Sequence, residues 1–254
     1  MSRFVSITEA REMQGLRMAC LRGVPSPWTE AAKGIFHHKG LDCQYAAQSE
    51  DDPDNAVADW AGDSSVPVVA FGDEPLRTGW AEILILAERL APEKPLLPAD
   101  WEGRMAVFGI GHELCGEMGL GWAGRNLLVG QGFESEGASG FHPKIGKFLS
   151  RKYGFREDEP VAYRERVMDI LKGLSARIEG RKFLVGDSLT AADIYWATFA
   201  NLLSPMPEDV LPMNPHFRKS WSSAEEGVKA AMSPALKAHQ ERIYAEYLET
   251  PVPL

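Results

Sequence analysis

The sequence predicts a mixed α/β domain followed by an all-helical domain, and three observations lead to this fold class. Strand-like and helix-like segments alternate over residues 1–91. Residues 92–100 contain three prolines and are typical of a linker. Residues 101–254 contain no convincing strand pattern. We therefore expect an α/β domain at 1–91, a linker at 92–100 and an all-α domain at 101–254.

The first domain begins with a polar lead-in at 1–15, in which a turn of helix is expected at 8–13. The elements expected next are a strand at 16–21, a helix at 26–40, a strand at 41–47, a short helix at 56–60, strands at 66–71 and 75–77, and a helix at 78–90. Ser26 and Pro27 suit the N-cap and first position of the 26–40 helix, and Gly40 suits its C-terminal stop. The order β-α-β-α-β-β-α is a thioredoxin-like topology.

The second domain should consist of helices only. We expect them at about 101–119, 142–153, 160–179, 190–203, 213–223 and 233–248. The glycine-rich segment 130–140 is predicted to be a mobile loop.

Composition excludes several functional classes. The 254-residue chain carries a net charge of −9 and has no basic run, so a nucleic-acid partner is not expected. No apolar run approaches the roughly 18 residues of a membrane span, and the N-terminus lacks the apolar core of a signal peptide. Three distant cysteines without a CxxC motif argue against a dithiol site and favour a reducing, cytoplasmic setting. The six histidines show no metal-binding spacing, so no metal is expected.

The most informative stretch is residues 183–196, which read FLVGDSLTAADIYW. Thr190 lies where an N-cap belongs and Asp193 lies three residues on, which is a capping-box arrangement. The nearly uncharged residues that follow predict a buried helix. Loss of the cap in Asp193→Ala should cost about 0.5–2 kcal/mol.

This stretch closely resembles the motif that opens the central buried helix of the glutathione transferase C-terminal domain. The predicted topology and three further segments, 26–40, Val66-Pro67 and 76–90, are similar to the same family, so the resemblance covers nearly the whole chain in layout. It implies a serine-type, bacterial-like member that uses glutathione as a co-substrate and forms a homodimer.

The resemblance assigns the thiol-binding part of the site. Ser26 matches the Ser or Cys that precedes Pro in the family, and its hydroxyl would stabilise the glutathione thiolate at a helix N-terminus. Thr29 is the second candidate donor. The Val66-Pro67 step resembles the family's cis-proline step, whose neighbouring backbone groups bind the cysteinyl unit like an added strand. Two alternatives remain: Ser26 acts only as a helix cap, and Pro67 is an ordinary trans proline.

The sequence departs from the family where the γ-glutamyl end binds. The family has Glu-Ser or Gln-Ser there, whereas this chain has Thr78-Gly79. Thr78 retains a hydroxyl, Gly79 offers a backbone N–H for a carboxylate, and Arg77 adds a positive charge. An acidic partner for the ammonium group is missing, and Glu82 substitutes for it only if the local backbone differs.

The second substrate would bind in the family's interdomain cleft, with Trp28, His112 and Trp122 as candidate wall residues; ordinary helix packing is the alternative for each. The resulting function is conjugation of glutathione to, or thiolytic cleavage of, a small apolar electrophile, as in detoxification. The alternative is a non-catalytic binding or scaffold protein with a degenerate glutathione site. Disulfide reduction is disfavoured because Ser26 stands where a cysteine is needed.

Overall fold

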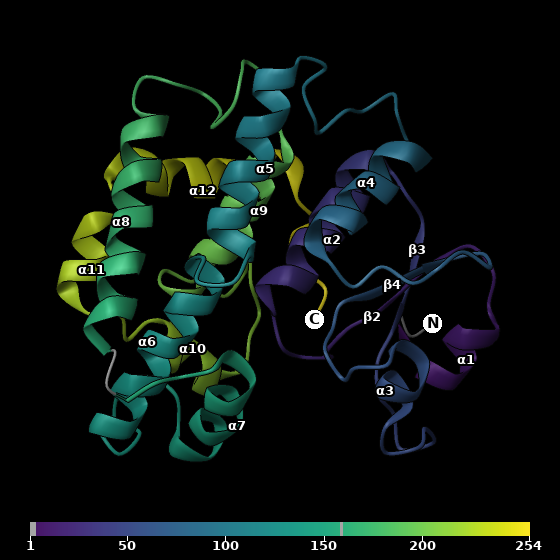
Figure 1. Ribbon diagram of the computed structural model, residues 1–254, viewed down its shortest axis with the longest axis horizontal. Coiled ribbons are helices and arrows are strands. Elements are labelled where there is room, and N and C mark those ends of the chain that lie inside the picture. The colour runs from purple at the N-terminus through teal and green to yellow at the C-terminus, as the bar shows by residue number, and fades with distance from the viewer. Residues whose placement is uncertain (1–3, 158–159) are drawn as a thin grey trace. The chain divides into compact units, whose positions relative to one another are not determined.

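The computed structural model of the chain describes residues 4–157 and 160–254 (Figure 1). The chain divides into two compact units. The first comprises the chain up to Leu96 together with Pro253–Leu254, and the second comprises Leu97–Val252. Each unit is described separately below.

The first unit is built on a four-stranded mixed sheet with the strand order β1-β3-β2-β4. The strands are β1 (Phe4–Val5), β2 (Leu16–Ala19), β3 (Cys43–Ala46) and β4 (Val68–Phe71). β3 is parallel to β1 and to β2, whereas β4 is antiparallel to β2. This sheet and its helices confirm the predicted α/β fold class.

Two pairs of helices cover the two faces of the sheet. The helices are α1 (Ile7–Glu12), α2 (Pro27–Lys39), α3 (Ala56–Ala61) and α4 (Trp80–Leu90). Ala19, Ala46 and Val68 are neighbours in register and form one buried cluster with residues of α1 and α3. Side chains alternate along a strand, so the adjacent row of Met18, Tyr45 and Val69 faces the other way. The packed pair α2 and α4 covers that second face (Figure 1).

The structure corrects two details of the predicted first domain. The lead-in contains the strand β1, which was not expected, and the helix α1 at the place where a turn of helix was expected. Ser6 and Glu9 form a capping box in which Glu9 Oε2 accepts the Ser6 N–H at 2.8 Å and Ser6 Oγ accepts the Glu9 N–H at 3.1 Å. The expected strand at 75–77 is reduced to one antiparallel bridge between Val69 and Arg77.

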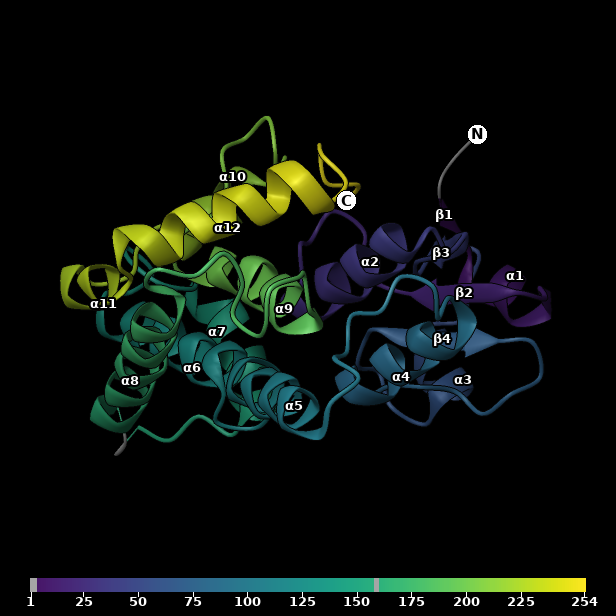
Figure 2. The ribbon, with the colours of Figure 1, turned by 90° about the horizontal axis from the view of Figure 1, so that it is seen from above.

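The described residues of the second unit form helices and no strand, which confirms the predicted all-α class. The helices are α5 (Trp101–Cys115), α6 (Leu120–Glu134), α7 (Pro143–Tyr153), α8 (Pro160–Ile178), α9 (Ala191–Phe199), the 3₁₀ turn η1 (Ala200–Leu202), α10 (Pro215–Trp221), α11 (Glu226–Ala231) and α12 (Pro234–Tyr247). Every residue of α9 is buried, as expected for the 190–203 segment. Figure 2 shows α9 between α5 and α12, which both contact it.

The prediction of a mobile loop at 130–140 is wrong over its first half, which belongs to α6. Glycine lowers helix propensity, yet here it permits close packing. A Cβ on Gly132 would lie 1.9 Å from the Phe141 carbonyl oxygen, and one on Gly130 would touch the Phe155 ring. The glycines of α6 are therefore explained by neighbours that approach its backbone, which no local pattern reveals.

Candidate functional site

The register of the sheet gathers three predicted segments at one end of its strands. Ala19, the last residue of β2, pairs with Val68, the first residue of β4, in antiparallel register. Val69 in turn forms an antiparallel bridge with Arg77. The chain after Ala19, the chain before Val68 and the chain after Arg77 therefore leave the sheet at the same end, here called the Ala19 end. Ser26, Val66-Pro67 and Thr78-Gly79 lie on these three segments.

Ser26 is the N-cap residue of α2, and Pro27 follows it at the first helical position. Its carbonyl accepts the Glu30 N–H at 2.9 Å and its own N–H donates to the Val24 carbonyl at 2.8 Å. Its hydroxyl forms no capping bond within the described chain. Helix capping therefore does not occupy the Ser26 hydroxyl, although the side chain is only 7% exposed.

The hydroxyl of Thr29 lies one turn further along α2. Thr29 is fully buried, and its Oγ1 has no hydrogen-bond partner among the described residues. A buried hydroxyl without a partner is uncommon. Both candidate donors at the start of α2 therefore have unused hydrogen-bonding capacity.

The Val66-Pro67 peptide bond is cis, as the family resemblance implies, and the alternative of an ordinary trans proline is wrong. Val66 is partly buried against the cluster that contains Ala19 and Val68. Its backbone N–H and C=O form no backbone hydrogen bond to any described residue. A donor and an acceptor are thus left unpaired at the Ala19 end, immediately before β4.

Gly79 is the N-cap residue of α4, and its side-chain position is occupied by another residue's carboxylate. A Cβ built on Gly79 would lie 1.9 Å from Glu82 Oε2. The exposed Glu82 side chain therefore folds back over the N-terminus of α4, where a carboxylate interacts favourably with the helix dipole. The Glu82 carboxylate thus lies beside Gly79, although neither position 78 nor position 79 is acidic.

Arg77 is already engaged by neighbouring groups. Its guanidinium bonds to Glu74 Oε2 at 2.5 Å and to the Pro75 carbonyl at 2.6 Å. Glu74 is shared with Arg89 at 2.6 Å, and the hydrogen bonds from Arg89 and then Arg77 lower the pKa of the Glu74 carboxyl. The charge of Arg77 is thus largely neutralised locally.

A buried ion pair beneath the start of α2 was not anticipated from the sequence. Lys33 Nζ lies 3.0 Å from Glu30 Oε1 and also donates to the Pro253 carbonyl at 2.7 Å. The same ammonium lies over the Tyr45 ring, 5.3 Å from its centroid. Glu and Lys three residues apart on a helix usually form a solvent-exposed pair, so only the packing of α2 on the sheet reveals this one.

Burial affects the ionisation of two groups near that pair. It raises the pKa of the Glu30 carboxyl to about 7, and the nearby Lys33 charge opposes the rise. It raises the pKa of the Cys20 thiol to about 12. The Cys20 thiol is therefore protonated at neutral pH.

The Glu30 carboxyl should make stability depend on pH. Its pKa is higher in the folded chain than the ordinary value of 4.5, so folding favours the protonated form and stability falls as the pH rises from about 4.5 through about 7. We expect urea unfolding at pH 5 and pH 8 to show a loss of up to about 3 kcal/mol that is absent in Glu30→Gln. The exposed Glu50→Gln is the control, and equal pH profiles for wild type and Glu30→Gln would contradict the prediction.

The three residues expected around a second substrate occupy different surroundings. Trp28 is half-buried on α2, and His112 is exposed near the end of α5. Trp122 on α6 packs edge-on against Tyr153 with ring centroids 4.9 Å apart. The cavities described in the second unit, one between α6 and α8 and one around residues 203–237, are lined by neither His112 nor Trp122.

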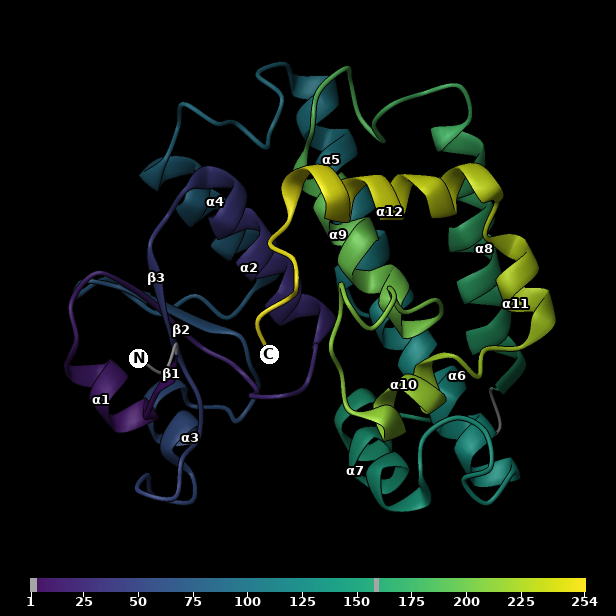
Figure 3. The same ribbon diagram turned by 180° about the vertical axis from the view of Figure 1, so that it is seen from behind.

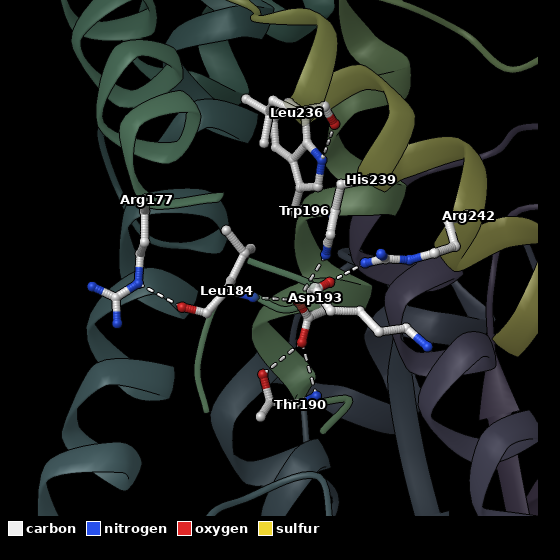
Figure 4. Close-up of polar contacts among 9 residues, drawn as sticks. Arg177, Leu184, Thr190, Asp193, Trp196, Leu236, His239 and Arg242 are labelled. Carbon is white, nitrogen blue, oxygen red and sulfur yellow. Dashed lines mark hydrogen bonds and ion pairs between the residues drawn. The ribbon is translucent and has the colours of Figure 1, made fainter. Parts of the chain in front are cut away.

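The capping box that begins α9 is confirmed and belongs to a larger buried network (Figure 4). Asp193 Oδ2 accepts the Thr190 N–H at 2.8 Å and the Thr190 hydroxyl at 2.9 Å. Asp193 Oδ1 accepts the Leu184 N–H at 2.8 Å and lies 2.9 Å from His239 Nε2. The carboxylate thus joins the start of α9 to the preceding turn and to α12, which is a structural role.

The described residues contain no cluster of three or more His, Cys, Asp or Glu suited to a metal ion. No described helix combines the length and hydropathy that spanning a bilayer requires.

Comparison with known proteins gives matches at the level of domain and fold. Residues 138–246 match the family model for the glutathione S-transferase C-terminal domain. A glutathione transferase family member from Pseudomonas fluorescens, solved with two glutathione molecules bound, is 16% identical at a TM-score of 0.65 and 94% coverage of both chains. A glutathione S-transferase from Methylobacterium radiotolerans, in complex with glutathione sulfonate, is 18% identical at a TM-score of 0.61, over 92% of this chain and 95% of that one.

A beta-etherase from a Sphingobium strain shares the fold with 17% identity and a TM-score of 0.58, over 90% of this chain and all of that one. No curated protein matches the sequence. A thioredoxin-like unit with a cis-proline step, followed by a helical unit with this capped buried helix, defines the glutathione transferase architecture. Residues 138–246 thus match the glutathione S-transferase C-terminal domain, and the chain shares the fold of solved glutathione transferases over most of its length.

Proposed function

We propose that the chain binds glutathione at the Ala19 end of its sheet and transfers it to a small apolar electrophile, by conjugation or by thiolytic displacement. The observation that carries this proposal is the convergence of unpaired hydrogen-bonding groups there. The Ser26 hydroxyl caps no helix, and the Val66 backbone groups have no backbone partner. Bound glutathione in two solved relatives is consistent with it.

Ser26 acts on the thiol. A free thiol has a pKa of about 8.5, so most of it is protonated at neutral pH. A hydroxyl donor at the N-terminus of α2, aided by the helix dipole, stabilises the thiolate and raises its concentration. The thiolate then attacks the electrophile, which is held close to it. Val66 holds the cysteinyl unit through its backbone N–H and C=O.

Glu82 supplies the acidic group that positions 78 and 79 lack. Its carboxylate lies over Gly79 and has no ion-pair partner in the described chain, so it pairs with the γ-glutamyl ammonium. The Thr78 hydroxyl and the Gly79 N–H bind the neighbouring carboxylate. Because Arg77 is held by Glu74, its contribution is small.

Loss of the Glu82 charge is expected to weaken glutathione binding. Glu82→Gln keeps the shape of the side chain, and removal of one exposed ion pair should raise the glutathione Kd by about 3–5-fold. Calorimetry would measure the change, with Glu93→Gln, an exposed carboxylate beyond α4, as the control. Tighter binding in Glu82→Gln would contradict the assignment and would indicate that the carboxylate competes with the γ-glutamyl carboxylate.

Calorimetric titration with glutathione tests the function as a whole, followed by turnover assays with a generic aryl halide. Saturable binding at millimolar glutathione or below, together with turnover, supports the enzyme. Absence of binding at millimolar concentrations would refute it. Such an absence would favour the second candidate, a non-catalytic protein of this fold with a degenerate glutathione site, for which the missing acidic residue at 78 or 79 is the specific argument. Binding without turnover of any electrophile class would indicate a glutathione-binding protein without transferase activity.

The chain is further expected to form a homodimer, and α5 offers an apolar face for it. Trp101 and Met105, four residues apart on that helix, are 69% and 49% exposed. Light scattering should give about twice the 28.0 kDa of one chain, and Trp101→Glu should lower the mass toward one chain. A wild-type mass near 28.0 kDa would contradict the dimer.

The three cysteines are free, which agrees with the reducing, cytoplasmic setting in which glutathione itself is found.

A further inference from the structure

Helix α7 packs on α6 with one side and exposes the other. On the inner side, a Cβ on Gly146 would lie 3.0 Å from the Phe133 ring, and the buried Tyr153 packs edge-on against Trp122. Figure 3 shows α7 at the lower edge of the second unit, and α6 is the helix that it contacts. The outer side consists of six exposed residues, which are Lys144, Ile145, Lys147, Phe148, Arg151 and Lys152.

These six residues form one continuous surface, here called the α7 face. At 3.6 residues per turn, their directions from the helix axis span only about 160°, and Phe148 lies near the middle of that arc. Phe148 is 64% exposed, and Ile145, its neighbour three residues earlier on the helix, is 36% exposed. An exposed apolar patch that is rimmed by polar residues is typical of an interaction surface.

The positive charge of α7 is concentrated and is not balanced locally. Residues 137–156 contain five Lys or Arg and no Asp or Glu, in a chain whose net charge is −9. Lys144, Lys147 and Arg151 form no ion pair with any residue in 4–157 or 160–254. An anionic surface therefore attracts the α7 face and repels the remainder of the chain, which would orient the protein.

The chemistry of the α7 face favours a lipid bilayer over a peptide or protein partner. A bound peptide is usually held in a groove, and neither cavity described in the second unit is lined by a residue of α7. Clusters of Lys and Arg on an amphipathic helix bind anionic headgroups. Their long side chains extend past an apolar neighbour to reach polar groups, while a Phe ring enters the boundary between headgroups and acyl chains.

We propose that the α7 face docks the protein reversibly on the surface of an anionic phospholipid bilayer. Phe148, with Ile145 beside it, inserts among the headgroups, and the surrounding Lys and Arg side chains bind the lipid phosphates. The contact is peripheral, because no described helix has the length and hydropathy to span a bilayer. Every residue of the α7 face belongs to the second unit, so the proposal is independent of the proposed glutathione site.

Vesicle sedimentation with the full chain tests the docking. One set of vesicles contains phosphatidylcholine alone, and in the other about one lipid in three is the anionic phosphatidylglycerol. We expect the protein to sediment with the anionic vesicles only. Binding should be lost near 1 M salt, because the screening length then falls to about 3 Å.

Two sets of variants assign the binding to the α7 face. The double variant Lys147→Gln/Arg151→Gln should weaken partitioning about 25-fold, since each cation near an anionic surface contributes about fivefold. Its control, Lys172→Gln/Lys237→Gln, removes the same charge from exposed positions on α8 and α12 and should partition as wild type. Phe148→Ser should weaken partitioning about tenfold, whereas Phe148→Leu, which keeps an apolar side chain, should retain most of it.

Unfolding midpoints establish that each variant remains folded. Absence of sedimentation with the anionic vesicles, or equal sedimentation with the neutral ones, would overturn the proposal. An equal loss in Lys172→Gln/Lys237→Gln would show that only the overall charge matters and would also overturn it. Binding to polyglutamate without binding to anionic vesicles would assign the α7 face to an acidic protein partner instead.

Discussion

Replacing Asp193 with alanine is expected to lower the free energy of unfolding by about 3–5 kcal/mol. The carboxylate is fully buried and accepts the N–H groups of Leu184 and Thr190 and the Thr190 hydroxyl, while His239 Nε2 lies 2.9 Å away. Alanine leaves these groups buried without an acceptor. The loss therefore exceeds the ~0.5–2 kcal/mol of a simple cap, and urea unfolding followed by circular dichroism measures it.

Two comparison variants separate the buried network from the cap. Asp187→Ala removes an exposed carboxylate from the same turn and should change stability by less than about 0.5 kcal/mol. His239→Gln removes only the contact from α12 and should cost less than Asp193→Ala. A loss below about 1 kcal/mol in Asp193→Ala would show that the network contributes little.

Ser26→Ala is expected to reduce kcat/KM with glutathione and an aryl halide by about 10²-fold. This is the lower end of the effect of removing one donor to a reacting anion. Because the Ser26 hydroxyl caps no helix, the substitution should leave the unfolding midpoint nearly unchanged. The apparent pKa in the pH profile of kcat/KM should also rise, because the glutathione thiolate loses a hydrogen-bond donor.

Thr29→Val is the matched variant for Ser26→Ala. It removes the other hydroxyl at the start of α2 and keeps the volume of the side chain. Thr29 is fully buried, so we expect activity within about threefold of wild type and, if anything, higher stability because an unpartnered polar atom is removed. A large loss in Thr29→Val with little loss in Ser26→Ala would transfer the thiolate-stabilising role to Thr29.

Helix ends and turns that are marked by capping residues, glycine or proline could be predicted from the sequence. Most differences between the predicted and observed elements lie in short elements and in a helix that contains several glycines. Gly40, Thr190 and the Val66-Pro67 step lie as predicted, because capping and proline chemistry act within a few residues. The capping box of Ser6 and Glu9 carries the same kind of signal, yet the six-residue helix after it is stabilised by the buried side chains of Ile7 and Ala10. α6 was missed because its glycines serve contacts with distant residues.

In the candidate site, too, some features follow from neighbouring residues in the sequence and others from tertiary packing. The sequence by itself determined the helix start at Ser26-Pro27 and the absence of an acidic residue at positions 78 and 79, whereas the cis form of the Val66-Pro67 bond was expected only from the family resemblance. Only the tertiary structure decided that the Glu82 carboxylate lies over Gly79, that Glu30 and Lys33 are buried, and that Asp193 joins α9 to α12. Capping and turn preferences involve neighbours in the chain, whereas burial and long-range hydrogen bonds depend on which elements pack together.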